Sequence, residues 1–460
     1  MISINKNIQS EILLTTMEEL VPKDSLFRKV DKYIDFTFIY DEVRYLYCED
    51  NGRPSIDPVV LFKLIFIQVL EGIKSMRQTC KKIKVDAEYR WFLGIPFGHD
   101  TPHFSTFSKN YERRFKDSDV FENIFKNIIM QAIKYKLVDG ETLYTDSTHK
   151  KANANKNKYE EVIEKVVKER KEWLEEEINE ERRKNGYKEF EYKDEYEEKA
   201  IKVSTTDKES GYYHRDNKEK GFMYLDHRTV DHKCNIIVDC YVTEGNVHDS
   251  KPYTERIKHI METFGFNVKR CAVDSGYDTL NIKKFFIDNN IFGVIGYRRY
   301  GTKESRKEKN KYEYNKKLDV YMEKETGEVL EYTGYINKQG YKRYQNLSKD
   351  KTINRHICEE INEQFRENRI SDEGKELYAF RKEKVERSFA DSKQNHGYRY
   401  AMYKGIKKNQ NYTWLICAAQ NMKNIAIKKD NVDGDKSIYN ILLTKISFFL
   451  QNFKKLTLKN

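Results

Sequence analysis

The sequence predicts an α/β fold, in which a mixed sheet with flanking helices follows a helical N-terminal region. Two observations predict this architecture. The first 115 residues have mostly helical patterning, with long apolar runs opened by turn and cap residues. From about residue 137 to residue 295, segments rich in β-branched and aromatic residues alternate with amphipathic helical segments. Strands that alternate with helices in this way indicate an α/β layer.

The N-terminal region, residues 1–136, is predicted to be all-helical. Asp57 and Pro58 are suited to the first turn of a long buried helix. Helices are expected over residues 59–76, 76–93 (ending at Gly94) and 105–115, and the last of them carries Lys109, Arg113 and Arg114. Two helices, a short turn and a third basic helix are typical of a helix-turn-helix-like DNA reader. The alternative is a helical bundle that only packs on the rest of the chain.

Residues 137–460 are predicted to form the sheet and its covering helices. Strands are expected at 143–145, 221–231, 235–245, 268–273 and 291–295, and helices at 252–264 and 280–289. After the first strand come two strands, a helix, a strand, a helix and a last strand, and this order predicts a mixed five-stranded sheet. Helical patterning returns at 376–395 and 409–428, and a short amphipathic helix at 438–450 is expected to turn its apolar side to the core.

Two polar segments, at about 157–215 and 298–375, are predicted to be insertions in this domain. Residues 157–199 include 11 basic and 16 acidic residues, which predicts a long exposed helix or mobile arm without chemistry. The second segment is rich in Tyr and Lys and weakly periodic, with short strands expected at 318–322 and 329–335.

Composition excludes several classes of protein. In 460 residues, 38% are hydrophobic and 13% aromatic, which excludes a disordered chain. The seven cysteines form no CxxC pair, which excludes a secreted disulfide framework and favours a reducing interior. No signal peptide is apparent, and the longest apolar stretch, residues 59–70, is too short and too polar for a membrane span. We therefore expect a soluble intracellular protein without a membrane partner.

The net charge of +11 is concentrated near the C-terminus. Residues 376–460 include 17 basic and 7 acidic residues, a balance of +10, so the chain before residue 376 sums to only +1. A basic face of this kind can contact a phosphate backbone. The alternative is a lysine-rich solvated surface.

Three carboxylates stand out by position: Asp146 and Asp274 at the ends of predicted strands, and Glu386 on a helix. In open α/β sheets, sites form outside the carboxyl ends of the strands. Mg²⁺ prefers carboxylate and water ligands, and two such ions can drive phosphodiester displacement. From spacing alone, a strand-end Asp is equally compatible with a cap or turn, and a helical Glu with a surface ion pair.

Basic and aromatic residues surround Glu386 in the sequence. Lys393 lies two helical turns beyond Glu386 on the same face, and Lys382 one turn before it. The candidate DNA-binding residues of this segment are Lys382, Arg387, Lys393, Arg399 and Lys404. Tyr398, Tyr400 and Tyr403 are interleaved with them, either to stack on unpaired bases or as ordinary packing.

These segments together resemble the DDE transposases of bacterial insertion sequences, in the group with a helical N-terminal domain. The matching segments are GRPSIDPVVLFKLIF (52–66), LYTDSTHKKANANK (143–156), VTEGNVHDS (242–250), AVDSGYDT (272–279) and RKEKVERSFADSKQNHGYRY (381–400). The resemblance implies an RNase H-like catalytic domain at 137–460 and a DNA-binding domain at 1–136. It also implies cutting at the terminal inverted repeats of the protein's own element and joining of the freed 3′-OH ends to target DNA.

Residue roles follow from the same resemblance. Asp146, Asp274 and Glu386 match the family's catalytic triad and would bind Mg²⁺, or Mn²⁺ in its place, with Lys393 in the E-x6-K half of the last signature. The resemblance also implies a homodimer on the element ends and a location in the bacterial cytoplasm, at the nucleoid.

The chain departs from the family signature in two places. Ala379 and Lys382 stand where Tyr and Arg are expected, whereas Tyr378 and Arg381 occur one place early. The cysteine-rich knuckle of many relatives is absent, since Cys358 is the only cysteine between residues 272 and 416, so no zinc is expected.

Two other functions remain open from sequence. A DNA-binding protein derived from a transposase but catalytically silent would keep the helical region and the basic tail. A metal-dependent phosphatase acting on small phosphoesters would need neither the helical region nor the basic tail. Three further residues, His149, Asp249 and Asp278, are polar and near the motifs. For them a structural role is favoured, with Asp249 and Asp278 as helix caps and His149 alternatively as a phosphate contact.

Overall fold

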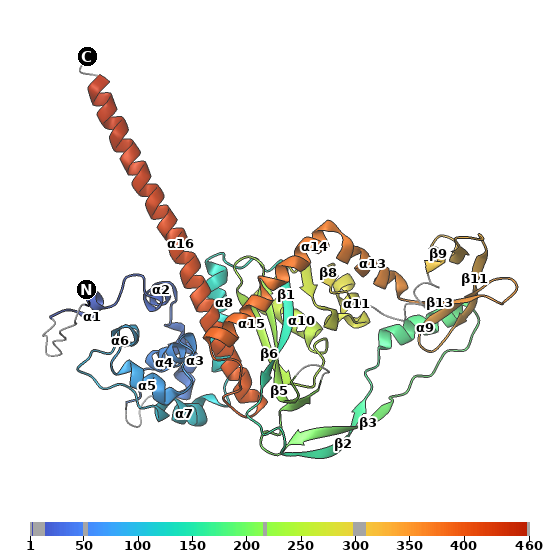
Figure 1. Ribbon diagram of the computed structural model, residues 1–460, viewed down its shortest axis with the longest axis horizontal. Coiled ribbons are helices and arrows are strands. Elements are labelled where there is room, and N and C mark those ends of the chain that lie inside the picture. The colour runs from blue at the N-terminus through green and yellow to red at the C-terminus, as the bar shows by residue number, and fades with distance from the viewer. Residues whose placement is uncertain (1, 3–13, 49–53, 215–218, 298–309, 458–460) are drawn as a thin grey trace.

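The fold is mixed α/β, with a mixed sheet, many helices and a smaller antiparallel sheet set apart from it (Figure 1). The computed structural model describes residues 2, 14–48, 54–214, 219–297 and 310–457. No helix in these ranges is both long and apolar enough to cross a membrane.

The N-terminal region is helical, as predicted. Its helices are α1 (Met17–Leu20), α2 (Leu26–Tyr33), α3 (Phe38–Val43), α4 (Pro58–Leu70), α5 (Met76–Ile83), α6 (Ala87–Leu93), α7 (Ser105–Asn110) and α8 (Val120–Lys134). A 3₁₀ turn (Arg44–Leu46) follows α3, and a π-helical turn (Tyr111–Phe115) extends α7. The Asp57 side chain accepts hydrogen bonds from the first backbone amides of α4, with Pro58 at its first position.

Two of the predicted helices are shorter than expected. The first ends at Leu70, because Gly72 has a φ of +58° and ends the helical path. The second divides into α5 and α6, because Asp86 caps a new helix by accepting from the amides of Glu88 and Tyr89. Its predicted end at Gly94 is confirmed, since that glycine adopts the left-handed conformation.

The main sheet places five strands in the order β6–β5–β1–β7–β8. Its strands are β1 (Thr142–Lys151), β4 (Gly211–Tyr213), β5 (Gly221–Asp231), β6 (Ile237–Glu244), β7 (Arg270–Val273) and β8 (Phe292–Ile295). β5 is antiparallel to β1 and to β6, whereas β7 is parallel to β1 and to β8. The sixth strand, β4, pairs with the start of β5; with three residues it is too short to show a period in the sequence.

Helices cover both faces of this sheet (Figure 1). They are α10 (Tyr253–Phe264), α11 (Leu280–Asp288), α15 (Val385–Asn395) and α16 (Ile406–Thr457). On β6, Asp239 accepts a hydrogen bond from Arg256 of α10 at 2.9 Å, and the next residue, Cys240, lies against Cys417 of α16. Because consecutive strand residues point to opposite faces, α10 and α16 lie on opposite sides of the sheet.

The prediction of a long exposed helix over residues 157–199 is wrong. The segment contains β2 (Tyr159–Val167), the 13-residue helix α9 (Glu172–Lys184) and the start of β3 (Tyr196–Ser204). β2 and β3 form an antiparallel two-stranded ribbon. Its register places Glu161 opposite Lys202 and Lys165 opposite Glu198, so charges that suggested a helix stabilise cross-strand pairs instead.

The second insertion forms a five-stranded antiparallel sheet of its own. Its strands are β9 (Tyr312–Asn315), β10 (Val320–Glu323), β11 (Val329–Ile336), β12 (Tyr341–Gln345) and β13 (Thr352–His356), followed by α13 (Glu359–Ile370) and α14 (Asp372–Ala379). The two strands expected from sequence correspond to β10 and β11. Helix α9 packs against β11, where Arg182 donates to the carbonyl of Ile336 at 3.1 Å, so α9 and the second insertion form one lobe (Figure 1).

One continuous apolar core joins the helical region to the sheet. Helix α16 connects them, because it packs on α2, α4 and α8 as well as on β6. The short helix predicted at 438–450 belongs to α16, which extends away from the body to its end at Thr457 (Figure 1). The side chains of this last stretch lie outside the described residues, so the expectation that they face the core stays a prediction.

Lys150, on β1, is a buried amine that should destabilise the fold. Its side chain lies over the ring of Tyr398, and its Nζ has no hydrogen-bond partner in the part of the chain that the structure describes. Burial lowers the pKa of Lys150 to about 7. Below pH 7 the folded state must therefore carry a buried charge, and this cost disappears as the pH rises from 7 towards the unfolded-state pKa.

We expect Lys150→Met to raise the free energy of unfolding at pH 7 by about 1–3 kcal/mol, because it removes an unsatisfied buried amine. Urea unfolding of both proteins should show this difference shrinking between pH 7 and pH 9. A difference that grows over that range would contradict the assignment of a lowered pKa.

Candidate active site

The parallel pairing of β1 and β7 brings Asp146 and Asp274 to one edge of the sheet. The pairing ends at Tyr144 and Ala272; Asp146 follows two residues later on β1, and Asp274 follows directly after β7. β1 is longer than predicted and continues beyond Asp146 to Lys151; there it pairs with β5, and Lys151 also forms a parallel bridge with Tyr400. Asp146 therefore marks the point where the parallel part of the sheet ends.

The carboxylate of Asp146 is largely buried and has two partners. Its Oδ1 accepts from the backbone amide of Ser147, and its Oδ2 from the Arg381 guanidinium, each at 2.8 Å. Burial raises the pKa of Asp146 to about 6, although Arg381 and the amide of Ser147 oppose the shift. The negative charges of Asp274 and Glu386 contribute to the same rise, so the fold brings all three predicted carboxylates within electrostatic reach of one another.

Arg381, which the sequence interpretation set aside, is the arginine at this site. It is 5% exposed, whereas the candidate Lys382 is exposed to solvent. Arg381 also donates to the hydroxyl of Tyr378 at 3.3 Å. A short 3₁₀ turn, Phe380–Lys382, and the non-helical Lys384 separate α14 from α15. This break accommodates the extra residue between Arg381 and Glu386, so Tyr378 and Arg381 keep their three-residue spacing although both occur one place early.

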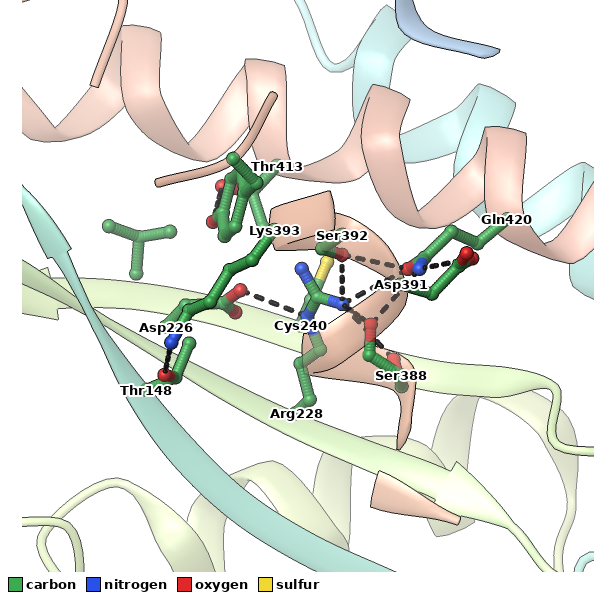
Figure 2. A network of polar contacts seen from close by, with 12 residues as sticks. Thr148, Asp226, Arg228, Cys240, Ser388, Asp391, Ser392, Lys393, Thr413 and Gln420 are labelled. Carbon is green, nitrogen blue, oxygen red and sulfur yellow. Dashed lines mark hydrogen bonds and ion pairs between the residues drawn. The ribbon is translucent and has the colours of Figure 1, made fainter. Parts of the chain in front are cut away.

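Lys393 reaches the same strand as Asp146. Its ammonium donates to the hydroxyl of Thr148, which lies two residues beyond Asp146 on the same face of β1 (Figure 2). The side chain is half-buried, and burial together with Arg228 and Arg399 lowers its pKa. Lys393 thus places a cation beside the carboxylate cluster.

A buried polar network holds α15, the helix that carries Glu386, against the sheet. Arg228 on β5 is fully buried and forms an ion pair with Asp226 at 2.9 Å. One nitrogen of the Arg228 guanidinium donates hydrogen bonds to Ser392 at 2.7 Å, to Gln420 at 3.0 Å and to the Ser388 hydroxyl at 3.1 Å (Figure 2). These contacts connect β5, α15 and α16 through one guanidinium, which fixes the position of Glu386 relative to the strands.

The predicted DNA-binding residues are spread over two regions. The exposed ones are Lys109, Arg113, Lys382, Arg387, Arg399 and Lys404. Arg114 differs, since it packs over the ring of Tyr47 at 4.5 Å and donates to Asn110. Of the interleaved tyrosines, Tyr398 is buried and bonds to Thr413 at 2.6 Å, so it serves packing, whereas Tyr400 is 61% exposed.

Three residues whose roles the sequence left undecided, His149, Asp249 and Asp278, make structural contacts. The helix-cap roles expected for Asp249 and Asp278 are wrong. His149 lies 3.1 Å from the carbonyl of Gly245 and packs on Tyr213. Asp278 forms an ion pair with Lys283 at 2.5 Å, and the residue that caps α11 is Thr279 instead of Asp278. Asp249 does not cap α10, which begins after Pro252 without a side-chain cap.

Carboxylate oxygens are the ligands that Mg²⁺ and Mn²⁺ prefer, and this cluster fits such an ion chemically. The raised pKa of Asp146 shows that Arg381 does not fully compensate its burial, and a divalent cation would supply the missing charge. Across the described ranges, no three acidic, histidine or cysteine side chains are close enough to hold a metal ion as they stand. Binding therefore requires that Asp146, Asp274 and Glu386 rearrange around the ion.

Comparison with known proteins identifies two matching families. Residues 15–113 match a transposase domain (DUF772), and residues 337–426 match a transposase DDE domain. The second match includes Glu386 and Lys393 but neither Asp146 nor Asp274. Among solved structures, a piggyBac transposase synaptic complex with hairpin DNA aligns with a TM-score of 0.35 and 9% identity, over 90% of this chain and 74% of that one. No curated protein matches the sequence.

Proposed function

Because this chain is a DDE transposase with an N-terminal transposase domain, we propose that it cuts DNA at the terminal inverted repeats of its own element and joins the freed 3′-OH ends to target DNA. The observation that supports this most directly is that Asp146 and Asp274 follow the paired ends of β1 and β7, with Glu386 within electrostatic reach of Asp146. The sheet order β6–β5–β1–β7–β8, antiparallel on one side and parallel on the other, supports the expected RNase H-like catalytic domain at 137–460.

The chemistry consists of two displacements at phosphorus. In cleavage, a water oxygen attacks the phosphodiester, the bond to the 3′-oxygen breaks, and the strand leaves with a 3′-OH. In joining, that 3′-oxygen attacks a target phosphodiester and displaces another 3′-oxygen. Bound divalent ions supply charge stabilisation for the attacking and leaving oxygens. Asp146, Asp274 and Glu386 would hold these ions, and Arg381 and Lys393 would supply positive charge for the phosphate oxygens.

The partners follow from this proposal. The helical domain, residues 1–136, would bind the terminal repeats through Lys109 and Arg113, and the exposed tail residues Lys382, Arg387, Arg399 and Lys404 would follow the backbone near the cut. Two element ends must be held together, which requires a homodimer on DNA. The protein would act in the bacterial cytoplasm, at the nucleoid.

The test is cleavage of DNA that carries the sequences flanking the protein's own reading frame. We expect nicks at inverted repeats with Mg²⁺ or Mn²⁺ and none with EDTA. Tight binding without nicking would favour the catalytically silent alternative. Binding to the same DNA should weaken steeply with salt, because phosphate contacts release counterions, and a salt-independent interaction would favour a small-phosphoester enzyme.

The pH dependence of cleavage tests the environment of Asp146. A protonated carboxyl group cannot hold a cation, so cleavage should fall as the pH drops through about 6. Arg381 lowers the pKa of Asp146, and Arg381→Met should therefore move this acidic limb to higher pH. The measurement is the midpoint of the limb, and a midpoint unchanged in the variant would contradict the ion pair.

A further inference from the structure

A fourth carboxylate, Asp249, lies beside the three described above. It belongs to the loop that joins β6 to α10, and no role in catalysis follows for it from sequence. Its Oδ1 accepts a hydrogen bond from the hydroxyl of Ser147 at 2.6 Å. Ser147 directly follows Asp146, so Asp249 is tied to the strand segment that carries the first catalytic carboxylate.

The other oxygen of Asp249 lies close to Asp274. Both carboxylates approach Gly276, which has no side chain: a Cβ at this position would stand 3.0 Å from Asp274 Oδ1 and 3.2 Å from Asp249 Oδ2. The glycine backbone amide donates to Asp274 Oδ1 at 2.7 Å. The absence of a side chain at Gly276 therefore allows two negative groups to share the space at this end of the sheet.

The hydroxyl of Tyr277 independently indicates that this space takes a ligand. Tyr277 is 1% exposed, and its hydroxyl has no hydrogen-bond partner among the residues with described positions. Burial raises the pKa of Tyr277, and the charges of Asp146, Asp249 and Asp274 add to the rise, so these three carboxylates are within electrostatic reach of Tyr277. Where the surroundings are polar, a buried hydroxyl without a protein partner can be satisfied by a bound water.

We propose that Asp249 is a positioning residue of the cation site: its Oδ2 would accept a hydrogen bond from a water bound to the divalent ion, while its Oδ1 holds Ser147. Ser147 in turn holds the segment with Asp146, and the Tyr277 hydroxyl completes the hydrogen bonds of the bound water. The inference rests on the proposed function, because the ion concerned is the one used in strand cleavage. Outer-shell partners of this kind typically change metal affinity by about 10–100-fold when they are replaced.

The test measures Mn²⁺ binding to the full chain without DNA, by the electron paramagnetic resonance signal of free Mn²⁺. Asp249→Asn removes the charge but keeps the shape and an oxygen that can accept from Ser147. We expect it to weaken Mn²⁺ binding at least about tenfold. Ser147→Ala keeps the charge and should weaken binding less. The matched control is Asp372→Asn, an exposed aspartate at the start of α14, which should bind Mn²⁺ as the wild type does.

Gly276→Ala is a second, independent variant, in case Asp249→Asn fails to fold by circular dichroism. Its added Cβ would push Asp249 and Asp274 aside, so weaker Mn²⁺ binding is expected here too. Wild-type Mn²⁺ affinity in either folded variant would overturn the inference.

DNA cleavage, measured separately, keeps this proposal distinct from the proposed function. Wild-type protein that cuts DNA while Asp249→Asn binds Mn²⁺ normally refutes the role of Asp249 alone. Conversely, wild-type protein that never cuts DNA, combined with weakened Mn²⁺ binding in Asp249→Asn, refutes the proposed function and leaves the inference standing.

Discussion

Asp146→Asn, Asp274→Asn and Glu386→Gln are each expected to reduce DNA cleavage at least about 10³-fold while leaving DNA binding within a factor of two or so of the wild type. Each change removes a negative charge from the carboxylate cluster and keeps the size of the side chain, so the ion is lost and the fold is kept. Cleavage is followed on DNA with labelled element ends, and binding on the same DNA in EDTA.

Asp146→Asn should differ from the other two variants in stability. The buried carboxylate of Asp146 has a pKa raised to about 6, so at pH 7 it is charged at a cost. Replacing the carboxylate removes that cost. It also removes the ion pair and leaves the buried guanidinium of Arg381 without its partner. The control for all three variants is Asp372→Asn, which should cut as the wild type does. Normal cleavage by all three active-site variants would refute the assignment of the catalytic residues.

Arg228→Met is expected to lower the free energy of unfolding by about 3–5 kcal/mol, the largest effect on stability that we predict. The substitution leaves Asp226 charged and buried without its cation, since both side chains are essentially inaccessible to solvent. It also deprives Ser392 and Gln420 of a shared donor (Figure 2). Urea unfolding followed by circular dichroism measures the change.

Two further variants separate the charge effect from simple loss of packing. The double change Asp226→Asn with Arg228→Met removes both charges and should recover much of the loss, because no unpaired ion then remains buried. Lys284→Met breaks an exposed pair with Asp288 (3.2 Å) and should cost less than about 0.5 kcal/mol. If Arg228→Met costs no more than Lys284→Met, the network does not hold α15 on the sheet.

Sequence patterns predicted the main sheet well, because its strands carry strong local signals. The segments around Tyr144, Val230 and Ala272 are fully buried, and buried strands are rich in β-branched and aromatic residues. Asp274 follows β7 directly, as predicted, whereas Asp146 lies within β1, just beyond its parallel pairing with β7.

The predictions failed where the local sequence does not show which distant segments come together in the folded chain. In the ribbon of β2 and β3, the two strands pair with each other across about 30 intervening residues, and no local period reveals such a partner. Arg381 was missed because the signature counts residues along a continuous helix, whereas Lys384 breaks the helix before Glu386. Asp249 and Gly276 are distant from each other in sequence, so only the folded chain shows that they meet.

The position of α16 also determines when the protein can fold during its synthesis. Ile65 on α4 and Leu415 on α16 line the same cavity of about 190 Å³, so the helical N-terminal region buries apolar side chains against an element that comes much later in the sequence. Domains usually fold in order as they leave the ribosome. Here the N-terminal helices must wait until residues up to Ala426 have emerged, since these residues complete their core. A chain truncated before α16 therefore lacks a finished core in its helical N-terminal region.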